Sequence, residues 1–181
     1  MSTNTTLDAI AAFFDSSQVP LACSDARDPE DPLLLVNDAF LRMSGYDADE
    51  VIGLNCRFLQ GERTSSQTRK TIRSDFTAGR DSQVLITNYR KSGEAFDNYL
   101  FIFTLKDIKG NPRYRIGSQF EVPDLHRNKA FHAHANNLKR GLDDLNAELD
   151  TTRQQLIRSG QLIGISIKSL LQARLEMLAT A

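Results

Sequence analysis

Residues 53–61 read Gly-Leu-Asn-Cys-Arg-Phe-Leu-Gln-Gly, and this stretch is the most informative part of the chain. It places the thiol of Cys56 between the carboxamide of Asn55 and the guanidinium of Arg57, with a second carboxamide at Gln60. A cysteine that only fills a core is surrounded by apolar side chains, so these polar neighbours indicate a thiol that reacts or faces a ligand. The stretch therefore predicts a site built around Cys56.

The composition is that of a globular protein without a strong charge bias. The chain has 181 residues, of which 40% are hydrophobic and 25% charged, and its 22 basic and 23 acidic residues leave a net charge of −1. This balance gives no argument for nucleic acid or an anionic membrane as a partner. The first apolar run, residues 7–14, is too short for a signal peptide, and no run approaches the roughly 20 apolar residues of a membrane span. We expect a cytoplasmic protein.

Neither the cysteines nor the histidines are spaced for a metal ion. Cys23 and Cys56 are the two cysteines of the chain, and all three histidines lie within residues 126–134. The paired Cys and His spacings of zinc sites are therefore absent. A cytosolic chain with two lone cysteines more often keeps both reduced. We expect neither a metal site nor a disulfide.

The rest of the chain predicts an α+β fold. Apolar and alternating runs predict five strands, at residues 19–23, 33–36, 83–90, 94–107 and 112–122. Thr6 is expected to cap a first helix that includes residues 7–14. Short helices are expected within residues 37–79, with Asn37 and Asp47 as caps and the longest helix at 67–77. This order predicts an antiparallel sheet with one face free to take helices or a ligand.

The last third of the chain predicts helices. Mostly apolar residues from Phe131 to Ile163 recur in steps of four and three, which is the pattern of a coiled-coil seam, although Ala135, Thr152 and Ser159 weaken its ends. Gly160 and Gly164 are expected to break the helix before a final one. The seam either pairs two copies of the chain or packs on its own sheet, and we favour the homodimer. The segment is only mildly basic, so a DNA-binding helix-turn-helix and a nucleic-acid partner are disfavoured.

Three side-chain amides are expected to share one face of the last three strands. With the first hairpin centred on Gly93, Asn88 lies opposite Asn98, and Gln119 joins the same face. Leu100 is among the apolar residues of that face. Buried amides without partners cost about 1–3 kcal/mol each, so a flat heterocycle with carbonyls and an N–H along one edge would satisfy them. The alternative is that the amides are exposed or bond to one another.

Two arginines are candidates for holding a phosphate. Arg57 belongs to the Cys56 stretch, and Arg73 belongs to the helix predicted at 67–77. Guanidinium groups match phosphate oxygens with two parallel hydrogen bonds. An arginine on a helix is otherwise a solvated surface residue, so the two carry weight only beside the neighbouring motif.

The stretch 53–61 resembles the signature of LOV (light-oxygen-voltage) domains, the flavin-binding branch of the PAS family, and the likeness covers residues 19–122. Arg73 matches the arginine that helps hold the flavin phosphate, Asn88 and Asn98 match the asparagines on the polar edge of the ring, and Gln119 matches the glutamine near its reactive nitrogen. With Cys56 as the photoactive residue, the resemblance implies a flavin-binding set of Ser24, Asn55, Arg57, Gln60, Arg73, Asn88, Asn98, Leu100 and Gln119.

The resemblance implies a blue-light photoreceptor and not an enzyme. FMN is bound in the dark, and light drives Cys56 to form a reversible covalent bond with the ring. The amide of Gln119 then rotates, and the change reaches the flanking helices or the dimer contact. The two arginines favour a phosphorylated flavin, while FAD and riboflavin stay open. The alternatives are a flavin redox sensor, in which Cys56 matters little, and a PAS dimerisation module that binds nothing.

The expected organisation is that of a bacterial-type short LOV protein without a fused effector. It has an N-terminal cap helix at residues 1–18, a five-stranded PAS/LOV domain at 19–122 and a helical, coiled-coil-like extension at 123–181. The chain departs from the family pattern at Pro20, Cys23, Ser24, Leu54 and Arg115. Arg115 replaces an aromatic or apolar residue near the expected ring, and Cys23 is either a second thiol near the flavin or, as we favour, a packing residue.

Overall fold

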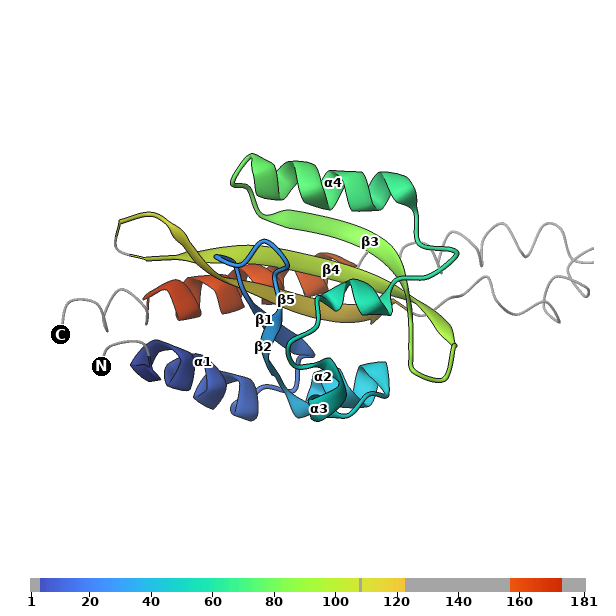
Figure 1. The fold of residues 1–181 in the computed structure, drawn as a ribbon, viewed down its shortest axis with the longest axis horizontal. Helices are drawn as coiled ribbons and strands as arrows, with labels where there is room; N and C mark the ends of the chain where they lie inside the picture. Colours follow the sequence, from blue (N-terminus) through green and yellow to red (C-terminus); the bar gives the residue numbers. More distant parts are fainter. Residues whose placement is uncertain (1–3, 108, 123–156, 174–181) are drawn as a thin grey trace, which may run out of the picture.

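Alternating apolar residues build five strands into one antiparallel sheet with the order β2-β1-β5-β4-β3 (Figure 1). The computed structural model describes residues 4–107, 109–122 and 157–173. The strands are β1 (Leu21–Asp25), β2 (Leu33–Val36), β3 (Ser82–Tyr89), β4 (Ala95–Lys106) and β5 (Pro112–Val122). The predicted α+β fold with five strands is confirmed, and the strand bounds differ from the predicted ones by at most two residues.

The register of the β3–β4 hairpin differs from the prediction by two residues. Asn98 pairs with Ile86, whereas Asn88 pairs with Phe96. Gly93, at a φ of 85°, takes the left-handed position that ends a three-residue hairpin loop, so the hairpin is centred one residue earlier than predicted. Because side chains alternate with a period of two, a shift by two residues leaves both asparagines on the predicted face.

Short helices connect β2 to β3, and side-chain caps determine where they begin. They are α2 (Asp38–Ser44), α3 (Ala48–Val51), the 3₁₀ helix η1 (Cys56–Leu59) and α4 (Ser66–Thr77). Asn37 caps α2 and Asp47 caps α3, as predicted. The first helix, α1 (Asn4–Ser16), begins two residues before Thr6, so the predicted Thr6 cap is wrong.

The outer face of the sheet is covered by α1 and by the helix of residues 157–173, drawn in red in Figure 1. Ile10 and Phe14 of α1 pack with Ile167 and Leu171 of the second helix. The strands contribute alternate residues to this core, namely Leu21, Cys23, Phe101, Phe103, Leu105, Tyr114 and Ile116. Cys23 therefore packs on the face opposite the predicted flavin, which confirms the packing interpretation.

The helix of residues 157–173 runs unbroken through Gly160 and Gly164, so the predicted break is wrong. Both glycines are buried because they are the contact face of the helix. A Cβ added to Gly164 would lie 2.2 Å from Cδ1 of Phe101, a separation that no real contact shows. The absence of side chains lets the helix lie close to the sheet. Most of the predicted heptad seam lies outside the described residues.

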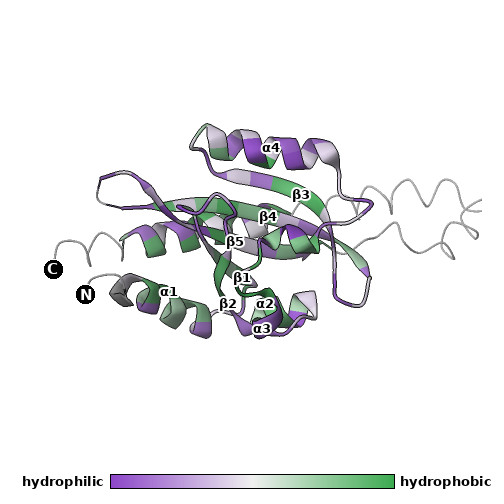
Figure 2. Cartoon of the chain, in the orientation of Figure 1, coloured by the Kyte–Doolittle hydropathy of each residue, from purple (hydrophilic) through white to green (hydrophobic). Residues whose placement is uncertain are grey.

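The inner face of the sheet is covered by α2, α3, η1 and α4. A second core lies where Phe40 and Met43 of α2 meet Val51, Leu59 and Phe96. In contrast, α4 has no fully buried side chain, and Figure 2 shows hydrophilic purple over much of this helix. The helix α4 covers its part of the sheet without filling the space beneath it. Within the described residues, no helix has the length and apolar character that crossing a membrane requires.

Candidate functional site

A cavity of about 700 Å³, counted with its opening to solvent, lies between the inner face of the sheet and helices η1 and α4. Apolar side chains supply most of the wall, including Leu33, Leu59, Ile72, Phe76, Ile86, Leu100 and Ile102. Gly117 lies between Arg115 and Gln119 on the same face of β5. The cavity is therefore shaped by the sheet and closed by the helices.

The three predicted amides meet in this cavity. Asn98 Nδ2 donates to Asn88 Oδ1 at 2.9 Å, and Asn88 Nδ2 donates to the carbonyl of Leu59 at 3.2 Å. Asn98 Oδ1 accepts the backbone N–H of Phe120 at 3.2 Å. The alternative that these amides bond to one another thus holds for the two asparagines. Gln119 is 2% exposed, and its Oε1 has no hydrogen-bond partner among the described residues.

Cys56 is the first residue of η1, and its side chain lines the cavity. Burial raises the pKa of its thiol to about 12, and the negative charge of Asp31 adds to the effect. The thiol is therefore protonated at neutral pH. Asn55 starts the helix, since its Oδ1 accepts the N–H of Arg57 at 3.0 Å. The polar neighbours of Cys56 thus serve first to place the thiol at the cavity wall.

The two arginines occupy different positions. Arg57 is exposed at the edge of the cavity and is among its lining residues. Arg73 is exposed on α4, one residue after the cavity-lining Ile72, and does not line the cavity itself. Neither guanidinium forms an ion pair with another of the described residues, which leaves both available to an anion at the opening. Their placement is consistent with a phosphate at the edge, with Arg57 nearer.

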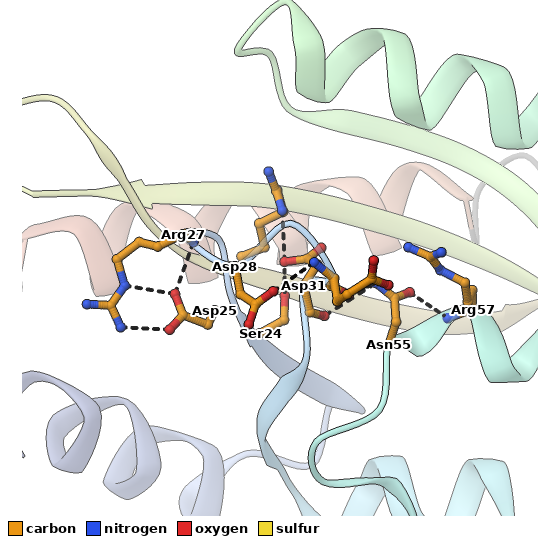
Figure 3. A network of polar contacts seen from close by, with 9 residues as sticks. Ser24, Asp25, Arg27, Asp28, Asp31, Asn55 and Arg57 are labelled. Carbon is orange, nitrogen blue, oxygen red and sulfur yellow. Dashed lines mark hydrogen bonds and ion pairs between the residues drawn. The ribbon is translucent and has the colours of Figure 1, made fainter.

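The remaining predicted residues, Ser24, Gln60 and Leu100, also line the cavity. The sequence did not predict several of the lining residues, among them Asp31, Ile72 and Phe76. The helix signal would have found the last two, because they are the apolar pair four residues apart on a polar helix. Asp31 lies in a loop and gives no sequence signal. Its carboxylate accepts from Ser24 Oγ at 2.8 Å and pairs with Arg115 at 2.8 Å, and Figure 3 shows this loop beside Asn55.

The residues present fit a flavin. Apolar side chains from β3 and β4 and from α4 form two walls that suit the faces of a flat ring system. The orphaned oxygen of Gln119 and the second N–H of the Asn88 and Asn98 amides suit its polar edge. The described residues contain no group of three or more His, Cys, Asp or Glu that would hold a metal ion.

Residues 22–122, more than half of the chain, match the family model described as "PAS domain". The chain is 33% identical to the LOV protein of Rhodobacter sphaeroides, whose crystal structure superposes with a TM-score of 0.64 over 92% of this chain and 97% of that one. The fungal blue-light photoreceptor Vivid, in its light-state dimer, is 32% identical, with a TM-score of 0.56 over 59% and 79% of the two chains. This chain belongs to the PAS domain family and, within it, to the LOV domains.

Among curated proteins, the chain is similar to a blue-light-activated histidine kinase of Rhizobium johnstonii. The two are 39% identical over 137 residues, which are 76% of this chain and 39% of the kinase. The bacterioopsin transcriptional activator of Halobacterium salinarum is 32% identical over 146 residues, or 22% of its length. The chain thus spans about two fifths or less of these relatives.

Proposed function

We propose that this protein is a blue-light photoreceptor that holds FMN in the cavity and signals through a reversible bond at Cys56. The observation that carries the proposal is the joint placement of Cys56, the three amides and the apolar walls around one cavity. Membership of the LOV domains supports it, as does the similarity to a histidine kinase that blue light activates. We further propose a cytoplasmic location and a sensor domain at residues 19–122 between helical flanks.

The chain's own residues divide the work of binding. Leu100, Ile86 and Phe76 contact the faces of the ring system, and Asn88 and Asn98 pair with its polar edge. Arg57 at the cavity and Arg73 on α4 attract the phosphate. Ser24, Asn55 and Gln60 contact the remaining polar groups. The exposed guanidinium of Arg57 favours FMN over riboflavin, while an adenine would have to lie outside the cavity.

When bound, the flavin supplies the blue-light absorption and an excited ring to which the Cys56 thiol adds reversibly. Cys56 waits in the protonated form because burial disfavours its thiolate. Gln119 can donate through its Nε2 or accept through its unpartnered Oε1, so it responds to a change of protonation beside it. The protein then returns to its initial state, so it acts as a switch and completes no substrate turnover.

The signal has a short route across the sheet. Gln119 faces the cavity, and the next residue, Phe120, faces the other side, where a Cβ on Gly160 would lie 3.4 Å from its Cβ. A movement of β5 therefore reaches the helix of residues 157–173. Leu162 and Leu170 of this helix are 66% and 62% exposed, so it is apolar on its outward side too. We propose that this side joins a second copy, as part of a homodimer through the flanking helices.

The absorption spectrum before and after a blue flash tests the photochemistry. The purified protein is expected to be yellow, to bleach after the flash and to recover in the dark. The Cys56→Ala variant is expected to keep its flavin and lose the bleaching. Bound flavin that never bleaches in the parent protein would favour a redox sensor. A protein that stays colourless after refolding with flavin would favour the interpretation as a dimerisation module that binds no flavin.

The molecular mass in solution, measured in the dark and under blue light at several concentrations, tests the signalling. Light is expected to change the dimer fraction of the parent protein and to leave that of Cys56→Ala unchanged. Leu162→Lys is expected to weaken the dimer, because it places a charge on the outward apolar side. Identical profiles in dark and light would rule out dimerisation as the output.

A further inference from the structure

Asp31 and Arg115 form an ion pair at the cavity wall. Arg115 Nη1 lies 2.8 Å from Asp31 Oδ1, and each side chain keeps only 18% of its surface exposed. Ser24 Oγ donates to the same carboxylate oxygen at 2.8 Å. Breaking a largely buried pair by removing one partner leaves an uncompensated charge and costs far more than breaking a surface pair. The pair therefore ties the loop of residues 26–32 firmly to β1 and β5.

The same arginine also holds α4. The guanidinium carbon of Arg115 lies 4.4 Å from the centre of the Phe76 ring, at the distance of a cation–π contact. Phe76 is one of the two apolar residues with which α4 lines the cavity. Since α4 has no fully buried side chain, this contact is important for keeping the helix against the sheet.

The loop is fastened on its other side to the Cys56 stretch. Asn55 Nδ2 donates to the carbonyl of Glu30 at 2.6 Å and to that of Asp31 at 3.4 Å (Figure 3). Asp31 has a φ of 53°, a left-handed conformation that strains a residue other than glycine, although aspartate tolerates it better than most. Such a conformation persists only where the surroundings hold it. Loss of the Arg115 contact would therefore free the loop next to Cys56.

We propose that the Asp31–Arg115 pair is a latch that closes the cavity beside Cys56 and limits the access of solvent and small solutes to its sulfur. Asp31 and Arg115 are positioning residues, since they act through loop 26–32 and α4. In the flavin-loaded protein the latch lengthens the lit state, because it keeps water away from the reacting groups. That consequence rests on the proposed function, whereas the closure itself is a property of the polypeptide.

Charge and closure predict different results for the two partners. The Asp31 carboxylate raises the pKa of the Cys56 thiol, so removing it makes the thiolate more abundant and alkylation faster. Removing the Arg115 charge leaves Asp31 uncompensated, so its electrostatic effect alone makes alkylation slower. Loss of the latch makes alkylation faster in both variants. The direction of the change in an Arg115 variant therefore separates the two effects.

The test is the alkylation rate of Cys56 by iodoacetamide in the full chain, with Cys23→Ala to silence the other thiol. It is measured without flavin and again with flavin in the dark. Asp31→Asn and Arg115→Gln are each expected to raise the rate about five-fold or more through local opening. Arg115→Lys keeps the charge that pairs with Asp31 but loses the planar guanidinium over Phe76, so it is expected to accelerate alkylation less than Arg115→Gln does. The control Arg27→Gln breaks a 2.6 Å ion pair in the same region, with Arg27 55% exposed, and should change nothing.

An unchanged or slower rate in Arg115→Gln would overturn the latch, as would an equal acceleration in Arg115→Lys. Backbone hydrogen exchange in residues 26–32 and 66–77 is the second readout, and it should rise in both disruptive variants. If one of the two disruptive variants fails to fold, hydrogen exchange in the other variant still tests the latch. If the variants change the alkylation rate as expected but the flavin-loaded protein never bleaches, the proposed function is overturned and the latch is not.

Discussion

At the scale of a single residue, the buried side chain of Asn37 stabilises the contact between several elements of the fold. It is 3% exposed, and its carboxamide has five backbone partners: the N–H groups of Leu21 and Phe40, and the carbonyls of Phe14, Ser17 and Val19. These partners belong to the end of α1, to β1 and to the first turn of α2. One side chain thus joins the N-terminal helix to the sheet and caps a second helix.

We expect Asn37→Ala to lower the free energy of unfolding by about 2–4 kcal/mol, because it leaves several buried backbone groups without partners. Urea unfolding of the flavin-free protein measures this. Ser65→Ala is the matched control, since Ser65 caps the exposed start of α4 with one 3.3 Å bond, and it should cost about 1 kcal/mol. Equal losses in the two variants would show that burial of the Asn37 network adds nothing.

Cys56 makes the stability depend on pH in a predictable direction. Its thiol has a folded-state pKa of about 12, against about 8.5 for an unfolded chain. The contribution of the protonated Cys56 thiol to the free energy of unfolding is therefore fully present below about pH 8.5. It is lost as the pH rises toward 12, because only the unfolded chain releases the thiol proton in this range. Cys56→Ser should make the fall in unfolding free energy between these values shallower, by up to about 1.4 kcal/mol per pH unit. Parallel curves for the two proteins, measured by urea unfolding, would contradict the raised pKa.

At the scale of an element, the helix of residues 157–173 depends on Gly164, where the neighbouring side chain leaves no room for a Cβ. Alanine favours a helix over glycine by about 1 kcal/mol. At Gly164 the added Cβ would meet the ring of Phe101, which is 2% exposed and cannot move aside. The steric cost therefore exceeds the gain in helix propensity.

We expect Gly164→Ala to lower the free energy of unfolding by about 1–3 kcal/mol and to raise hydrogen exchange in residues 157–173. Ser169→Ala, on the exposed side of the same helix, should be neutral or stabilising by up to about 0.5 kcal/mol. A Gly164→Ala variant that is more stable than the parent would mean that the helix does not lie against Phe101.

At the scale of the whole molecule, the cavity separates two layers that a ligand would join. The sheet supplies one wall, and α4 supplies the other with only the half-buried Ile72 and Phe76. A ligand that binds only the folded state stabilises it by about 2.7 kcal/mol at a concentration of 100 times its Kd. Flavin should therefore raise the melting temperature and protect α4 from hydrogen exchange.

The difference between FMN and riboflavin tests the phosphate contact at this scale. We expect FMN to raise the melting temperature more than riboflavin at equal concentration, because the proposed contact of Arg57 with the phosphate is a charge-assisted hydrogen bond. Arg57→Gln should weaken FMN binding about 10-fold and leave riboflavin binding unchanged. Lys70→Gln, on the exposed part of α4, serves as the control. An equal loss for both flavins would place Arg57 away from the phosphate.

The sequence alone determined the five strands, the helix caps at Asn37 and Asp47, and the face that carries Asn88, Asn98 and Gln119. These features depend on local propensity and on the period of two along a strand, both of which are set by neighbouring residues. An error of two residues in the hairpin did not matter, because alternation restored the face. The resemblance to LOV domains likewise followed from the sequence, because the Cys56 motif and the separate positions of Arg73, Asn88, Asn98 and Gln119 all match the family pattern.

Only the tertiary structure decided which contacts residues make with partners far away in the chain. Gly160 and Gly164 would end an isolated helix, but the close approach of Phe101 and Phe120 makes them its contact face. Asp31 has no local signal, and its carboxylate is held at the cavity by Ser24 and by Arg115, which lies more than 80 positions later in the chain. Propensity is a property of neighbouring residues, whereas packing and ion pairing depend on how separate elements meet in space. That is why the strands could be predicted and the latch could not.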